Sequence, residues 1–133
     1  MNGKTVVAGI LGGLVLFFSG GLFYVLLMSD FFATAADKAE PLFVYIILGE
    51  VFLGILLAWV LAQTGATSLA DGAKSGAMVG FLFALGMGFI MYGAYNFSDL
   101  TTHLVDVVVW DVRWAVAGSV AGWYLGRESA ASA

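Results

Sequence analysis

Four long apolar runs, separated by short polar stretches, account for most of this chain. They cover approximately residues 5–28, 41–63, 75–96 and 104–125. Each run is close to the roughly 20 residues that a helix needs to cross a bilayer, whereas a strand of a membrane barrel needs only about 9 to 11 residues and alternates in polarity. The pattern predicts an all-α membrane protein with four transmembrane helices in a single domain, residues 1–133.

The connections between the runs predict how the helices are arranged. Roughly 5 to 12 residues join consecutive runs, so neighbouring helices should lie side by side and antiparallel, as an up-down-up-down bundle. Pro41 suits the start of the second helix, because its missing N–H costs nothing there. Asp99 is a candidate N-cap for the fourth helix.

A secretory signal peptide is a competing interpretation of the first run. Lys4 would supply its positive start, and Ala33-Thr34-Ala35 resembles a small-residue cleavage site. The run is longer than the roughly 7 to 15 apolar residues of a usual signal peptide. We therefore expect it to be retained as the first span.

The composition agrees with a membrane location and excludes several kinds of function. Apolar residues make up 62% of the 133 residues and charged residues only 11%, against about 25% charged in soluble domains. Five Lys and Arg at a net charge of −4 form no basic surface for nucleic acid. The absence of cysteine excludes a disulfide scaffold and a thiolate nucleophile. The expected surroundings are the lipid bilayer.

The distribution of Lys and Arg predicts the orientation. In the predicted bundle Lys4, Lys74 and Arg127 fall on the side of the termini, and Lys38 falls on the other side. Positive residues concentrate on the cytoplasmic side of membrane proteins. Both termini of this multi-pass chain should therefore be cytoplasmic.

Three charges lie deep inside the apolar runs. Glu50 lies nine residues after Pro41 and Arg113 ten after His103, which at 1.5 Å per residue places both about 14 to 15 Å into the membrane. An ionisable residue at that depth costs roughly 2.5 to 3.5 kcal/mol and needs a partner. We therefore predict a buried polar cluster of Glu50, Asp111 and Arg113.

The helical phase of the fourth run separates its two acids. Asp106, Trp110 and Arg113 fall on one stripe, whereas Asp111 points about 140° away from Asp106. With Glu50 and Asp111 sharing one deep cation, one of these acids should be protonated or matched by a bound cation. Asp106 lies about a turn from the outer boundary.

Polar residues at the outer end suggest a vestibule above this cluster. They are Tyr92, Tyr95, Asn96, Asp99, His103 and Asp106. The competing interpretation is that the tyrosines are interfacial anchors and the others capping residues. One His with no second His or Cys does not make a metal site, and no motif for a phosphate loop or a nucleophile occurs, so we expect no metal and no cofactor.

Small residues at four-residue spacing predict close helix packing. They are Gly9, Gly13, Gly76, Gly80, Ala84, Gly88, Gly118 and Gly122. Gly118 and Gly122 share the side of Asp111, which should therefore face a neighbouring helix. If the protein is a carrier, the seams of the first and third runs are candidate interfaces of a homo-oligomer.

Two stretches carry a resemblance to a known group. Residues 92–102, YGAYNFSDLTT, and the later Asp111-Val112-Arg113-Trp114 resemble the C-terminal half of small bacterial four-span membrane proteins catalogued as domains of unknown function. The stretch from Leu57-Ala58-Trp59 to Gly65-Ala66-Thr67 is similar to a related group. The resemblance implies a fold and a bacterial cytoplasmic membrane, and brings no activity. Small multidrug transporters are also four-span chains, but their essential Glu is expected in the first helix, where this chain has no charge.

Two functions remain open from the sequence. In the first, the protein is a non-enzymatic binding or structural module, or an accessory module of a membrane partner subunit, and the charged cluster holds its helices together. In the second, it is a proton- or cation-coupled transporter or channel for a small solute that works as an oligomer. Catalysis has the least support.

Overall fold

The computed structural model describes residues 1–33 and 40–131, with side chains up to Arg127, and these residues form helices and no strand. Thr34, Ala35 and Lys38, on which the cleavage and orientation arguments partly depended, lie outside the described residues. The helices are α1 (Gly3–Gly20), η1 (Gly21–Leu27), α2 (Ser29–Phe32), α3 (Phe43–Thr64), α4 (Leu69–Ala94) and α5 (Leu100–Ala131).

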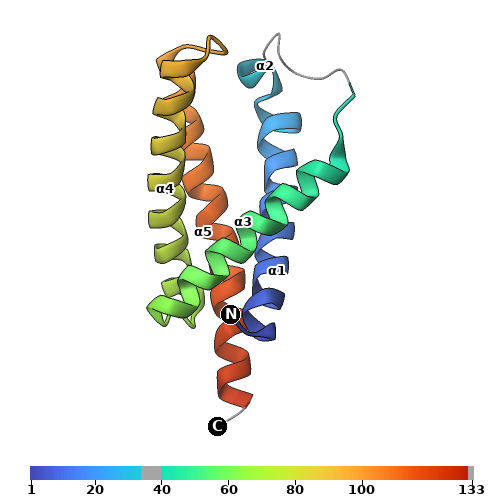
Figure 1. Ribbon diagram of the computed structural model, residues 1–133, viewed down its shortest axis with the longest axis vertical. Coiled ribbons are helices and arrows are strands. Elements are labelled where there is room, and N and C mark those ends of the chain that lie inside the picture. Colours follow the sequence, from blue (N-terminus) through green and yellow to red (C-terminus); the bar gives the residue numbers. More distant parts are fainter. Residues whose placement is uncertain (34–39, 132–133) are drawn as a thin grey trace.

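The long helices form two antiparallel pairs (Figure 1). One pair is α4 with α5, the other is α1 with α3, and α5 also packs against α1. The start of α1, the connection from α3 to α4 and the end of α5 lie at one end of the bundle, and α2 lies at the other (Figure 1). The all-α prediction is confirmed, and consecutive long helices run in opposite directions.

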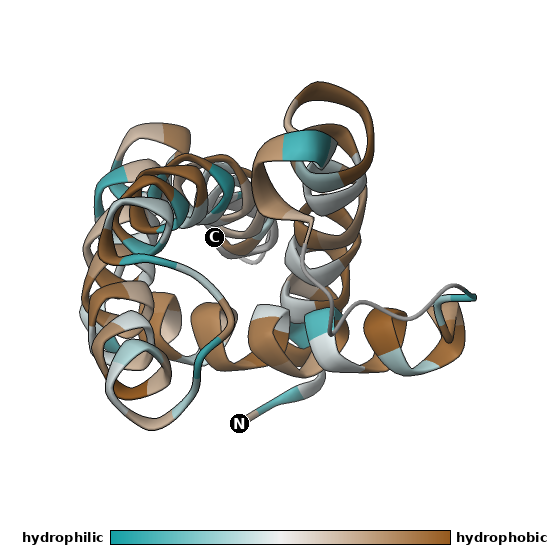
Figure 2. Cartoon of the chain, turned by 90° about the horizontal axis from the view of Figure 1, so that it is seen from above, coloured by the Kyte–Doolittle hydropathy of each residue, from teal (hydrophilic) through white to brown (hydrophobic). Residues whose placement is uncertain are grey.

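Among the described residues, three helices are long and apolar enough to cross a membrane by length and composition. They are Gly3–Leu27, which joins α1 to η1, Phe43–Thr64 and Leu69–Ala94. Large apolar side chains such as Phe52 (69% exposed) and Ile90 (60% exposed) point outward from them. Figure 2 shows mostly hydrophobic ribbon along these helices. These features are those of a membrane protein, since a soluble fold would turn such side chains inward.

Two helices begin earlier than the apolar runs predicted. The helix expected from residue 75 begins at Leu69, because the Ser68 hydroxyl accepts the backbone N–H of Asp71 at 3.0 Å and caps the helix. The fourth apolar run begins at residue 104, but the helix begins at Leu100, directly after the predicted N-cap Asp99, which accepts the N–H of Thr102 at 2.8 Å. Polar residues in the first turn had therefore concealed the start of α4 only.

Glycines set the two closest helix contacts. A Cβ added to Gly118 on α5 would lie 2.2 Å from the carbonyl oxygen of Gly72 on α4. On α1, a Cβ on Gly13 would lie 2.6 Å from the Cα of Val51, and one on Gly54 of α3 would lie 2.3 Å from the Gly13 nitrogen. Backbones approach this closely only where side chains are missing.

Most of the small residues predicted for packing lie in these two contacts. Gly9 and Gly13 meet α3, and Gly76, Gly80, Gly118 and Gly122 lie between α4 and α5. Ala84 is buried. Gly88 is different, because a Cβ there would have its nearest neighbour at 3.9 Å. Since both seams are filled within one chain, the expectation that they form interfaces between copies is not supported.

The N-terminal half of α3 lies away from the other long helices. Figure 1 shows α3 crossing the other helices obliquely. The C-terminal half of α3 buries Leu57, Ala58 and Leu61, whereas every residue from Phe43 to Gly49 is exposed. A wedge-shaped space therefore opens between the start of α3 and the end of the first span, and the candidate site lies beside it.

Candidate functional site

Arg113 is the centre of the polar site in the bundle. Its Nη2 lies 2.6 Å from Oε1 of Glu50, and its side chain is 2% exposed. Arg113 lies on α5 and Glu50 on α3, so the ion pair links two helices that are distant in sequence. The two residues meet at the common depth at which residue counting placed them.

The first span completes the surroundings of the guanidinium. Nη2 also donates to the backbone carbonyl of Leu16 at 2.7 Å, and Nε donates to the Ser19 hydroxyl at 3.4 Å. The Arg113 Cζ lies 5.3 Å from the ring centroid of Tyr24 and 5.5 Å from that of Trp110. Aromatic faces attract a guanidinium at this range. One side chain therefore joins α1, α3, α5 and η1.

The approach of Arg113 to the first span requires glycine at position 20. A Cβ on Gly20 would lie 2.8 Å from Nη2 of Arg113 and 3.6 Å from Oε1 of Glu50. Because the guanidinium is buried and held by Glu50 and Leu16, it cannot move aside without losing a hydrogen bond. Gly20 thus lets the charged pair lie against the helix backbone.

A second polar contact lies next to the first. The Tyr24 hydroxyl on η1 donates to Oδ1 of Asp106 on α5. Both residues are partly buried, and the Tyr24 ring lies between this acid and Arg113. With both acids ionised, the site holds two carboxylates and one guanidinium, an excess of one negative charge.

Asp111 does not join this cluster, contrary to the prediction. It is partly buried and makes no hydrogen bond or ion pair with the residues that the structure describes. The reason is helical phase, since two residues along an α-helix turn the side chain by about 200° from Arg113. Asp106, seven residues before Arg113, shares its face and is the second acid of the site.

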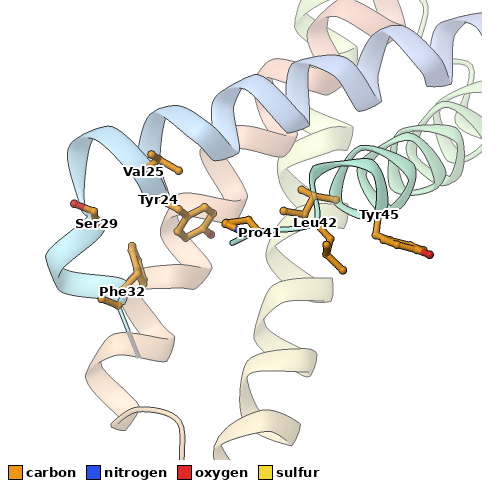
Figure 3. A pocket seen from close by; sticks show the side chains of 9 residues that line it. Tyr24, Val25, Ser29, Phe32, Pro41, Leu42 and Tyr45 are labelled. Atoms are coloured by element: carbon orange, nitrogen blue, oxygen red, sulfur yellow. The ribbon is translucent and has the colours of Figure 1, made fainter. Parts of the chain in front are cut away.

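A large cavity lies between η1 and α2 on one side and the start of α3 on the other, among the residues that the structure describes. It has a volume of about 1010 Å³ (Figure 3). Its wall is lined by Tyr24, Val25, Ser29, Phe32, Ala33, Pro41, Leu42, Tyr45 and Ile46. A smaller cavity of about 230 Å³ shares Tyr24, Val25 and Ile46 with it and reaches Glu50. The two cavities therefore adjoin, and the smaller one reaches one partner of the ion pair.

The predicted vestibule is not a cavity. The crevice beside His103 is too tight to admit a water molecule. His103 contacts the Ser98 hydroxyl at 3.2 Å and the edge of Tyr92, and Tyr95 stacks on Phe97. Asn96 is exposed in the same connection. These polar groups therefore contact local neighbours and do not line an open space among the described residues.

Capping accounts for Asp99 as well. The Thr102 backbone N–H donates to its carboxylate at 2.8 Å and holds the pKa of this exposed group below its ordinary value of 3.8. Asp106, which was placed in the same vestibule, instead reaches inward to Tyr24. The open space lies on the opposite side of the site, toward α3.

Three contributors to the site were missed from the sequence: Ser19, Gly20 and Tyr24. Ser19 and Tyr24 are the only side chains with a hydroxyl between residues 6 and 28, which is the signal that could have found them. In a regular α-helix, residues five apart point about 140° apart. Here the helix changes to π geometry at Gly21, and Met28 donates to the carbonyl of Phe23, five residues back. The wider turn brings both hydroxyl residues to Arg113.

The geometry limits what the site can do. No group of three His, Cys, Asp or Glu among the described residues could hold a metal ion. Glu50 has one oxygen engaged by Arg113 and lines a cavity with otherwise apolar walls, so it can receive a ligand. No family model, no curated protein and no solved structure matches the chain.

Proposed function

We propose that the protein is a four-span integral membrane binding module of the bacterial cytoplasmic membrane, with both termini cytoplasmic and no enzymatic activity. The observation that carries the proposal is the buried Arg113, which holds Glu50 of α3 and the Leu16 carbonyl of α1 at 2.6 and 2.7 Å. This contact fixes three helices at one level and supports the cavity beside them.

The membrane location of α5 is part of this proposal. Two of the three charged residues in its apolar run, Asp106 and Arg113, turn toward the other helices and find partners there, and the third, Asp111, is partly buried. Its opposite face carries exposed valines, Val108, Val112 and Val116. A helix with charges directed inward and valines directed outward suits a bilayer, because the buried pairs remove the cost of exposing charge to lipid.

Single-cysteine labelling tests the four-span topology. Because the chain has no cysteine, one can be introduced separately at Asn2, Thr67, Ser98 or Ser129 and labelled in intact cells with a membrane-impermeant maleimide. We expect labelling at Ser98 alone, with the other three positions labelled only after lysis. Labelling of Ser98 and Ser129 from the same side would show that α5 does not cross the membrane.

A second candidate function is proton- or cation-coupled transport. It is favoured by one observation, the position of Glu50 in a cavity that adjoins the larger cavity. Its test is pH-dependent ion flux into liposomes containing the native chain, Glu50→Gln or Arg113→Ala. Flux that is abolished by Glu50→Gln in a folded variant would establish transport. Absence of flux, with both variants only less stable, would leave the binding module.

A further inference from the structure

From the geometry of the cavity and Glu50 we infer the class of ligand: a lipophilic organic monocation that enters between η1 and the N-terminal half of α3 and places its positive charge at Glu50. This inference deepens the proposed function and rests on it. It concerns the two adjoining cavities of about 1010 and 230 Å³, which share Tyr24, Val25 and Ile46.

The charge of the ligand follows from the state of Glu50. Its Oε1 accepts from Arg113, but Oε2 makes no hydrogen bond with the described residues. Glu50 is 16% exposed and lines the smaller cavity. A carboxylate oxygen left without a partner among apolar walls is costly. An approaching cation would satisfy it.

The neighbouring charges favour the same sign. When both are ionised, Glu50 and Asp106 together exceed the single charge of Arg113, whose Nη2 is held by Glu50 and by the Leu16 carbonyl. An anionic head group that approaches Glu50 from the smaller cavity would meet its carboxylate. An uncharged chain would fill the cavity and leave Oε2 without a partner. A cation removes the excess negative charge.

The wall chemistry indicates a bulky apolar body. The smaller cavity around Glu50 is lined by the rings of Phe17, Phe18, Tyr24 and Phe43, with Val25 and Ile46. Aromatic rings attract organic cations through their faces. A bare metal ion is a poorer candidate, because Glu50 has no second and third His, Cys, Asp or Glu beside it among the described residues to complete a metal site. An organic cation with aromatic or alkyl substituents can contact the apolar walls of the cavity and also pair with the Glu50 carboxylate.

The route of entry is set by α3. Val25 is 64% exposed and Tyr45 71% exposed, and they stand on opposite sides of the larger cavity. Figure 3 shows that the lining side chains come from the end of the first span and from the start of α3. A ligand dissolved in the bilayer could therefore reach Glu50 sideways, without crossing the core of the bundle.

Equilibrium dialysis of tetraphenylphosphonium against the full chain in phosphatidylcholine nanodiscs tests this inference. Tetraphenylborate, which has the same shape and the opposite charge, is the ligand control, and empty nanodiscs measure partition into lipid. We expect saturable binding of the cation at about one per chain and none of the anion. Equal binding of both ions, or no saturable binding of the cation, would overturn the inference.

Matched variants on α3 locate the site. Ile46→Trp fills the space shared by the two cavities, and Glu50→Gln removes the charge while it keeps the shape; each should weaken cation binding about tenfold or more. Leu48→Trp, at an exposed position of the same helix outside both cavities, should bind as the native chain does. Native affinity in Ile46→Trp would refute the site. Because the topology assay needs no ligand, failure of this inference and failure of the proposed function are distinguishable.

Discussion

Gly20 lies against Arg113 so closely that a Cβ at position 20 would be 2.8 Å from Nη2 of the guanidinium. Gly21, the next residue, has nothing within 4 Å of its own Cβ position. The two adjacent residues therefore have different structural roles, although both are glycine. Gly20 admits the charged side chain to the backbone of the first span, and Gly21 is the first residue of the π-helix.

Gly20→Ala should destabilise the protein by about 1 to 3 kcal/mol, because the added methyl must displace a buried guanidinium or the helix that holds it. Gly21→Ala is the matched control and should cause no loss. Unfolding in mixed micelles with increasing SDS measures both. Equal stability of the two variants would show that Arg113 does not lie against position 20.

Tyr24→Phe removes the hydrogen bond to Asp106 and keeps the ring beside Arg113. We expect a loss of about 1 kcal/mol in the free energy of unfolding, the usual value for one such bond between membrane helices. Tyr45→Phe is the control, since Tyr45 is 71% exposed and makes no hydrogen bond with the described residues. The same SDS titration applies. A loss equal to that of the control would contradict the contact.

Gly118→Ala should separate α4 from α5, because its Cβ would lie 2.2 Å from the carbonyl oxygen of Gly72. We expect a destabilisation of about 1 to 3 kcal/mol. Gly86→Ala, on the open side of α4 with nothing within 4 Å, should be neutral or slightly stabilising, as alanine favours a helix. If Gly118→Ala leaves the free energy of unfolding unchanged, the backbones of α4 and α5 are not in close contact at Gly118.

Residue counting placed Glu50 and Arg113 at one depth, and this worked because helix rise is uniform along apolar runs. The start of α4 was harder to predict, since Ser68 caps this helix within polar sequence, whereas Asp99 was recognisable as the N-cap of α5. The membrane requirement itself was readable from length and apolar composition alone. Apolar runs thus predict where helices lie more reliably than where they begin.

The membership of the site was only partly predictable. Charge balance suggested that Asp111 belongs to the cluster. The helical phase of α5 instead places Asp106 on the same face as Arg113, and both contact Tyr24. Tyr24 depends on a change from α to π geometry, for which local sequence carries no rule beyond the paired Gly20 and Gly21. The cavity lies where the start of α3 stands apart from the first span, whereas the close contact of α3 with α1 is at Gly54, far along the helix from the cavity.

The link between α3 and α5 through Glu50 and Arg113 is best measured by a double-mutant cycle. Glu50→Gln, Arg113→Gln and the double variant would be unfolded in SDS beside the native chain. If the two side chains form the buried pair described above, their effects are non-additive, with a coupling of about 1 kcal/mol or more. Effects that add to within about 0.3 kcal/mol would show that the residues do not interact, and would contradict the proposed site.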